Sequence, residues 1–312
     1  MPAMDASELR RERTQNLWVS LQRKLPPLAK AATLDAGSEV PFERIGGLSA
    51  AKDELLTYAC AATHPEVYER WGTFPPSALL LLGQRGAGKT LLAHALATRT
   101  ESGFLSISVP HLVVELLRSG GRLSEWTPTF TQSLAEMPPV TVFFNELEFT
   151  QTEEMGGRRS DLPQGPVMDF LLEFIDQTIA VKTTLVVGAT SHPETLRQAF
   201  VMPGRFERIV EVNPIFPDDI VMALQIHAAD AEKRAGHPLF DSVDWAAVVR
   251  QYREPAPGDW VRLMHATLRR KARFEAAGET VKLATTQDLM DEVDRARKAR
   301  TRLPSAGGGI YL

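Results

Sequence analysis

The grouping of residues with the clearest chemistry is an eight-residue segment of the pattern glycine, four residues, glycine, lysine and threonine. Its members are Gly83, Gln84, Arg85, Gly86, Ala87, Gly88, Lys89 and Thr90. Glycines permit positive φ and a close backbone approach, so the N–H groups of such a loop converge on phosphate oxygens. Lys89 would then reach the β- and γ-phosphates of ATP, and the Thr90 hydroxyl would ligate Mg²⁺. A coincidental glycine-rich turn is the alternative interpretation.

The neighbours of this segment favour the phosphate-binding interpretation. The apolar run from Ala78 to Leu82 precedes it and predicts a buried strand, and the residues from Leu91 to Leu96 predict a helix. The loop is therefore expected between a strand and a helix, as phosphate binding requires, with Leu91 at the helix start among the nucleotide-binding residues.

A second candidate group follows the predicted strand from Val140 to Phe144. Glu146 is placed to orient and deprotonate an attacking water. Asn145 stands where an aspartate would help to hold hydrated Mg²⁺, and an amide lacks the negative charge that a hard cation prefers. Nucleotide binding is expected to survive this change, while turnover suffers. An ordinary strand terminus is the alternative.

A third group lies near the last two predicted strands. Ser191 follows the run from Thr184 to Thr190, where a polar side chain would contact the γ-phosphate or the water. Arg205 and Arg208 precede the last strand, and an arginine there would neutralise charge on a transferring phosphoryl group. Taken alone, such a pair is more often a set of surface ion-pairing residues.

These groups need a scaffold, and the apolar runs supply one. The predicted strands are Leu79–Leu82, Phe104–Val109, Val140–Phe144, Thr184–Thr190 and Ile209–Val212. Helical segments separate them, which predicts an α/β fold with a parallel five-stranded sheet and helices on both faces. Ligands of such sheets bind at the carboxyl ends of the strands.

The chain divides into four expected segments. Residues 1–40 form an N-terminal helical extension, 41–213 the α/β nucleotide-binding domain, 214–300 a small all-helical lid domain, and 301–312 a flexible tail. In the extension, Leu17, Leu21 and Leu25 share one helix face, which predicts a helix packed on the main domain. A helix that docks a partner is the alternative.

Bulk properties narrow the class of protein. The 312 residues are 44% hydrophobic, with a net charge of −4 and Cys60 as the single cysteine. A negative net charge gives no general attraction to nucleic acid or to an anionic membrane. No apolar stretch approaches the length of a membrane span, and one cysteine suits a reducing compartment. The expected location is the cytoplasm.

In the order in which they occur, these pieces resemble the AAA ATPase family, in the branch of valosin-containing protein, the proteasomal ATPases and the AAA metalloproteases. The similar segments are Pro41–Leu48, His64–Gly72 with Pro75 and Pro76, Ala189–Leu196, and Gly204–Arg208. The resemblance runs from about Pro41 to Ala299.

The resemblance implies roles that the residues alone do not. It places Ile45, Gly46 and Gly47 beside the adenine, and His227 and Gly258 in the lid near the nucleotide. Ser191 would be the first sensor. Arg205 and Arg208 would be arginine fingers acting on the nucleotide of the neighbouring subunit, which implies a ring, usually a homo-hexamer.

Three departures from the family pattern lower the expected rate of ATP hydrolysis and the expected ability to thread substrate. Asn145 replaces an aspartate and Ser191 an asparagine, and the segment from Leu116 to Gly121 lacks the aromatic residue that grips substrate in the pore of family unfoldases. The ending Ile310-Tyr311-Leu312 is similar to tails that dock into a proteolytic cylinder; an incidental disordered end is the alternative.

The sequence thus predicts a ring-forming ATPase that couples ATP binding, and slow hydrolysis with weak activity, to remodelling or unfolding of a protein partner. The rival hypothesis is a structural or regulatory ring that binds nucleotide and hardly hydrolyses it. A DNA-linked ATPase is a weaker third hypothesis, because no basic face is evident.

Overall fold

The computed structural model describes residues 6–118, 125–150, 164–196 and 198–301. The chain forms two compact units, one of Met1–Arg44 with Ser49–Asn213 and the other of Ile45–Leu48 with Pro214–Leu312. The pore-loop prediction at Ser119–Gly121 and the docking prediction for Ile310–Leu312 lie outside the described residues.

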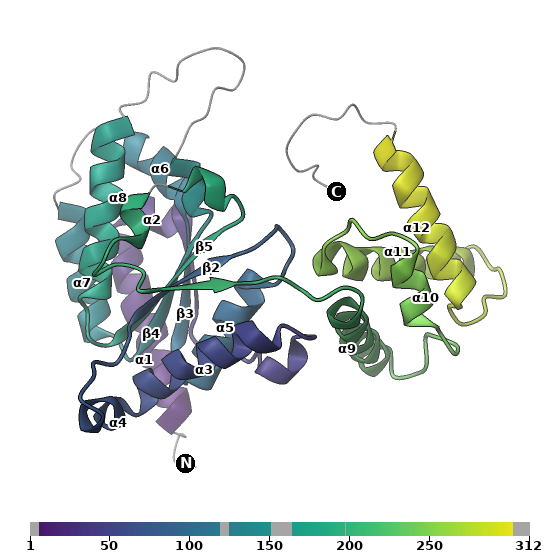
Figure 1. The fold of residues 1–312 in the computed structure, drawn as a ribbon, viewed down its shortest axis with the longest axis horizontal. Coiled ribbons are helices and arrows are strands. Elements are labelled where there is room, and N and C mark those ends of the chain that lie inside the picture. The colour runs from purple at the N-terminus through teal and green to yellow at the C-terminus, as the bar shows by residue number, and fades with distance from the viewer. Residues whose placement is uncertain (1–5, 119–124, 151–163, 197, 302–312) are drawn as a thin grey trace. The chain divides into compact units, whose positions relative to one another are not determined.

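The first unit is built on a six-stranded sheet in the order β1-β3-β4-β5-β2-β6 (Figure 1). The strands are β1 (Ala32–Asp35), β2 (Ala78–Leu82), β3 (Gly103–Ser108), β4 (Val140–Asn145), β5 (Thr184–Thr190) and β6 (Arg208–Glu211). Strands β2 to β6 are the five predicted ones, and they are mutually parallel. The predicted parallel sheet is confirmed.

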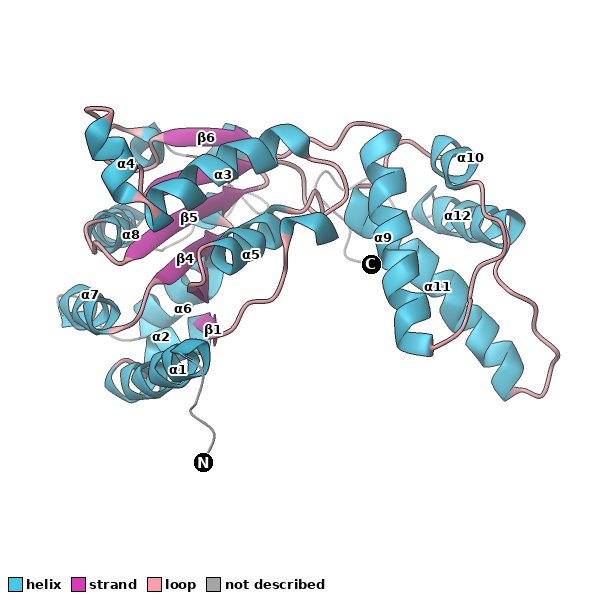
Figure 2. Cartoon of the chain, turned by 90° about the horizontal axis from the view of Figure 1, so that it is seen from below, coloured by secondary structure: helices cyan, strands magenta, loops and turns pink. Residues whose placement is uncertain are grey.

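Helices cover both faces of this sheet. They are α1 (Ala6–Lys24), α2 (Pro26–Ala31), α3 (Ser49–Thr63), α4 (Pro65–Arg70), α5 (Lys89–Arg99), α6 (Val109–Arg118), α7 (Trp126–Glu136) and α8 (Gln164–Ile179). Short 3-10 turns occur at η1 (Phe42–Arg44), η3 (Leu147–Thr150), η4 (Pro193–Thr195) and η5 (Gln198–Val201). Helices α3 and α5 lie on one face, and α6, α7 and α8 with α1 and α2 lie on the other (Figure 2).

Burial on both faces explains why the central strands read as unbroken apolar runs. In β2, Leu79, Leu80 and Leu81 are fully buried, and every residue of β5 is buried. Side chains of a strand alternate between its two faces, so a strand covered on both sides needs apolar residues at every position. Helices α5 and α8 both contact β5, the strand beside β2 at the centre of the sheet.

The N-terminal extension is part of this core. Trp18, Leu21, Leu25 and Leu28 are buried in the same cluster as side chains of α6 and α7. The interpretation as a helix packed on the main domain is confirmed, although Trp18 is also buried on this face and Leu17 is only partly buried.

Strand β1 is the element that the sequence analysis missed. It follows α2 directly and pairs antiparallel with β3, with Leu34 opposite Leu105. The expected five-stranded sheet is therefore extended to six by the N-terminal segment. Its four residues, Ala32 to Asp35, carry only two apolar side chains, which is too short a pattern to distinguish a strand from a loop.

The second unit is helical, as predicted. It consists of α9 (Asp218–Ala235), α10 (Trp245–Arg250), α11 (Pro257–Ala276) and α12 (Thr286–Thr301). Its core includes Leu224, Trp260, Met264, Leu289 and Val293. The segment Ile45–Leu48 belongs to this unit rather than to the sheet-containing one.

No helix in the described ranges has the length and apolar character needed to cross a membrane.

Candidate functional site

Parallel pairing brings Ser191 and the groups that follow β2 and β4 to one edge of the sheet, whereas Arg208 begins β6 opposite Leu79, at the other end of β2. Strands β4, β5 and β2 are consecutive neighbours, and Leu82 pairs with Thr190 while Phe144 pairs with Gly188. The loops that follow these three strands therefore begin side by side. Gly83 N also donates to Thr190 O at 3.3 Å, which ties the start of the glycine-rich loop to the end of β5.

The glycine-rich loop has the conformation that phosphate binding needs. It forms a tight turn in which Ala87 N donates to Gln84 O at 3.1 Å. Gly86 and Gly88 have φ of 81° and 110°, which side chains with a Cβ rarely adopt. Gly88 then begins α5 without a side chain to cap it, so the first N–H groups of that helix face the loop and favour an anion.

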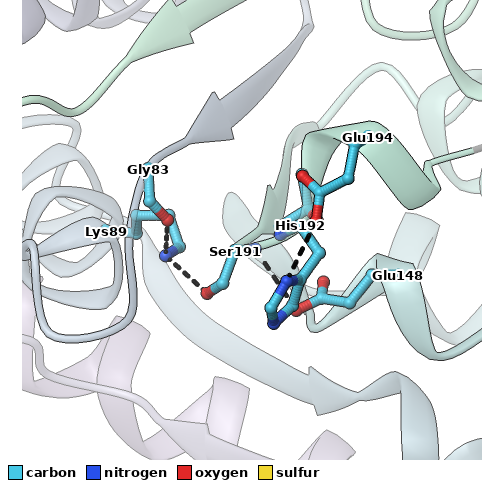
Figure 3. A network of polar contacts seen from close by, with 7 residues as sticks. Gly83, Lys89, Glu148, Ser191, His192 and Glu194 are labelled. Carbon is cyan, nitrogen blue, oxygen red and sulfur yellow. Dashed lines mark hydrogen bonds and ion pairs between the residues drawn. The ribbon is translucent and has the colours of Figure 1, made fainter. Parts of the chain in front are cut away.

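Lys89 lies at the centre of the loop. Its Nζ donates to the backbone oxygens of Gly83 and Gln84, at 2.6 and 3.0 Å, and to Ser191 Oγ at 2.9 Å (Figure 3). Only 7% of the residue is exposed. These partners fix the ammonium group beneath the loop, at the end of β5.

The electrostatics of Lys89 make the loop a site for a negative ligand. Burial lowers the pKa of Lys89 below its ordinary value, and Glu148 opposes this shift. Arg85 lowers the pKa further, and Glu146 again opposes the shift. A buried ammonium with mostly neutral partners is destabilised, and phosphate oxygens would compensate its charge.

Ser191, which follows β5 directly, joins this arrangement. The Ser191 hydroxyl accepts a hydrogen bond from Lys89, and the Ser191 backbone N donates to Glu148 Oε1 at 3.2 Å. Glu148 lies in η3, directly after the β4 end, so one carboxylate links the tips of β4 and β5 (Figure 3). His192 and Glu194 form an exposed pair at 3.2 Å beside it.

Glu148 is the site residue that sequence reasoning missed. Its Oε2 atom is buried, and among the described residues it has no hydrogen-bond partner. The available signal was an acidic residue two positions after Glu146, next to the same strand end. A carboxylate that bonds to the sensor backbone is suited to position Ser191.

Glu146, the predicted general base, pairs with the loop itself. Arg85 NH2 lies 3.0 Å from Glu146 Oε1, and the two side chains are 59% and 34% exposed. Glu146 has φ of 62°, an uncommon backbone conformation for a residue other than glycine that clusters at functional sites. Asn145 is the last residue of β4 and lies half-buried opposite Ser108 of β3.

The two predicted arginine fingers each have an ion-pair partner in their own chain. Arg205 makes a two-pronged contact with Asp176 of α8, Nε to Oδ1 at 2.7 Å and NH2 to Oδ2 at 2.9 Å. This hydrogen bonding raises the pKa of Arg205 above its ordinary value. Arg208 pairs with Glu54 of α3. Any action on a neighbouring subunit would require these pairs to be exchanged or extended.

The remaining predicted residues belong to the helical unit. Gly46 packs so closely on α9 that a Cβ there would lie 2.2 Å from Ala223 N. The backbone N of Leu48, which follows Ile45, Gly46 and Gly47, donates to Asp219 Oδ2 at 3.0 Å. His227 lies half-buried on α9, and Gly258 lies in the first turn of α11.

The loop residues fit a Mg²⁺–nucleotide complex. Thr90 is exposed at the first turn of α5, next to Lys89, where its hydroxyl is open to a ligand. Within the described part of the chain, no three His, Cys, Asp or Glu side chains are grouped to hold a metal ion.

The structure has a strand of a mostly parallel sheet, then a glycine-rich loop, then a helix that begins with a buried lysine. This arrangement defines a P-loop nucleotide-binding protein. Residues 79–214 match the model of the ATPase family associated with various cellular activities (AAA). Residues 79–214 therefore form an AAA ATPase domain, which implies nucleotide binding.

Curated relatives agree with this assignment. The chain is 34% identical to a proteasome-activating nucleotidase of Methanocaldococcus jannaschii over 64% of its own length and 46% of the relative's. It is 26% identical to protein CdcH of Halobacterium salinarum (87% of the chain, 37% of the relative). It is 28% identical to ATP-dependent zinc metalloprotease FtsH 3 of Conexibacter woesei (89% and 37%). The chain thus spans less than half of the length of these relatives.

Proposed function

We propose that this chain is the motor module of a ring-forming ATPase that hydrolyses ATP slowly and couples it to remodelling or unfolding of a protein partner. The observation that carries the proposal is the convergence of Lys89, Ser191 and Glu146 at the carboxyl ends of three adjacent strands. That the partner is a protein is inferred from the relatives, among them a proteasome-activating nucleotidase. The cytoplasm is the proposed location.

The proposed mechanism assigns one task to each group. The glycine-rich loop and Lys89 hold the phosphates, and Thr90 with Asn145, the latter through water, holds Mg²⁺, which supplies charge neutralisation on the phosphate oxygens when bound. Glu146 accepts a proton from water as the water oxygen attacks the γ-phosphorus and the bond to the ADP oxygen breaks. Ser191, positioned by Glu148, contacts the γ-phosphate or the water.

A nucleotide-binding ring with little hydrolysis is the second candidate function. Two observations favour it: Asn145 lacks the charge that a Mg²⁺ site prefers, and Arg205 is held by Asp176 of its own chain. The following two predictions separate the candidates.

Restoring the carboxylate with Asn145→Asp is expected to lower the Mg²⁺ concentration for half-maximal hydrolysis by about tenfold, the size of a typical outer-shell effect, or to raise turnover. The measurement is phosphate release during a Mg²⁺ titration. Glu146→Gln in both backgrounds is the control for activity from this site. If Asn145→Asp changes neither quantity, the limitation lies at Ser191 or in assembly.

Removing one arginine finger tests the ring. Arg205→Ala is expected to bind ATP normally and to lose hydrolysis by roughly a thousandfold. Mixing it with Lys89→Ala protein should restore part of the activity, because a Lys89→Ala subunit still offers Arg205 to the intact P-loop of its neighbour.

The matched control for that experiment is Asp176→Ala. It removes the same intrachain ion pair but leaves the guanidinium in place. Retained hydrolysis in Asp176→Ala, with loss in Arg205→Ala, supports action between subunits. Equal loss in both variants, or normal hydrolysis by Arg205→Ala in a monomer, contradicts the ring model.

A further inference from the structure

Arg85 brings a positive charge into the proposed catalytic site from the glycine-rich loop itself. Its guanidinium lies 3.0 Å from Glu146 Oε1, across 61 residues of sequence. Arg85 also lowers the pKa of the Lys89 ammonium, so both cations act on the same small space. The loop thus holds two positive groups where a triphosphate would place its negative oxygens.

The partner of Arg85 locates the guanidinium relative to the reacting atoms. Glu146 is the proposed base, so its carboxylate must contact a water that lies about 3 to 3.5 Å from the γ-phosphorus. A guanidinium bonded to that carboxylate would therefore lie on the side of the site where the γ-phosphate is expected. ADP has no such oxygens, and with ADP the pair with Glu146 would persist.

The competition favours the phosphate when ATP is present. The Arg85–Glu146 pair is 59% and 34% exposed, and exposed ion pairs are weak. Guanidinium–phosphate contacts are two-pronged and charge-assisted, and the γ-phosphate carries more negative charge than one carboxylate. Arg205 and Arg208, in contrast, are held by Asp176 and Glu54 within the chain.

We propose that Arg85 detects the γ-phosphate by exchanging one partner for another. Its guanidinium pairs with Glu146 in the absence of ATP and contacts the γ-phosphate when ATP is bound. This exchange releases Glu146 for the attacking water. This inference rests on the proposed ATPase function and deepens it. Arg85 is then a residue that determines the preference for ATP over ADP, and it makes the base available only when there is a bond to cleave.

The decisive experiment measures equilibrium binding of ATP and ADP in the Glu146→Gln background. That background blocks hydrolysis and weakens the competing ion pair, so the contact of Arg85 with the γ-phosphate is seen directly. Adding Arg85→Ala is expected to weaken ATP binding by about tenfold, the value of a charge-assisted contact, and to leave ADP binding within about twofold. Arg85→Lys should fall between, because lysine keeps the charge and loses the fork.

Arg99→Ala is the matched control, because Arg99 is an exposed arginine at the far end of α5, the helix that follows the loop. It is expected to leave the ratio of ATP to ADP affinity unchanged. Loss of the ratio in Arg99→Ala as well would mean that removing any arginine near the loop has the same effect, which would overturn the specific role of Arg85.

The exchange of partners has its own readout. With Glu146 intact and a non-hydrolysable ATP analogue, Arg85→Ala should weaken binding less than in the Glu146→Gln background, because breaking the pair with Glu146 offsets part of the phosphate contact. Equal weakening of ATP and ADP, or no weakening of either, refutes the inference. If the protein with Arg85 intact binds neither nucleotide, the proposed function itself fails.

Discussion

Lys89→Ala is expected to weaken ATP binding by about a hundredfold, equivalent to about 3 kcal/mol. The ammonium group is buried and already fixed by Gly83, Gln84 and Ser191, so it is preorganised for the phosphates and loses little entropy when they bind. Alanine removes both the charge and this preorganisation. Titration with a fluorescent ATP analogue measures the change.

The control for Lys89→Ala is Lys182→Ala. Lys182 is exposed and lies just before β5, at the amino end of the strand whose carboxyl end meets the P-loop. It carries the same charge at the opposite edge of the sheet, and its removal should leave ATP binding unchanged. If Lys89→Ala is folded by circular dichroism and binds ATP as the wild type does, the nucleotide site lies elsewhere.

Glu146→Gln is expected to reduce hydrolysis by about 10²- to 10⁴-fold, the contribution of a general base, while ATP binding persists. The amide keeps the size and the hydrogen-bonding oxygen of the side chain but cannot take a proton from water. Steady-state phosphate release and nucleotide titration of the same sample separate the two effects.

A matched carboxylate tests whether this loss is specific. Glu211 is exposed at the end of β6 and pairs in register with Leu82, so it lies at the same edge of the sheet as the P-loop. Glu211→Gln should hydrolyse ATP at the wild-type rate. Equal loss in both variants would mean that acidic residues at this edge act through general electrostatics rather than through proton transfer.

The sequence predicted the parallel strands because burial on both faces requires apolar residues at every position. All five residues of Ala78–Leu82 are apolar, as that requirement predicts. The glycine-rich loop that follows has the spacing of glycines and lysine that phosphate binding needs. Neighbouring strand ends then follow from parallel pairing, which brings Ser191 beside Lys89 in the structure. Strand β1 escaped detection because it is only four residues long and pairs with β3, a segment far from it in the sequence.

Side-chain partners were less predictable than strands. Arg85 and Glu146 are 61 residues apart, and Arg205 and Asp176 are 29 apart, so their pairing depends on the finished fold. From the sequence, Arg85 had only a place in the loop, and the family resemblance implied a role between subunits for Arg205. In the structure both arginines have carboxylate partners within the chain.

Hydrolysis of ATP at the P-loop edge of this sheet is the activity on which the proposed function depends. Its most direct test is phosphate release from the wild-type protein at saturating ATP and Mg²⁺, over protein concentrations that span assembly, beside Glu146→Gln and Lys89→Ala. We expect a slow turnover per subunit that rises with concentration to a plateau and is absent from both variants. Wild-type turnover no greater than that of Glu146→Gln at every concentration, with ATP bound to both proteins, would contradict it and leave a nucleotide-binding ring without catalysis.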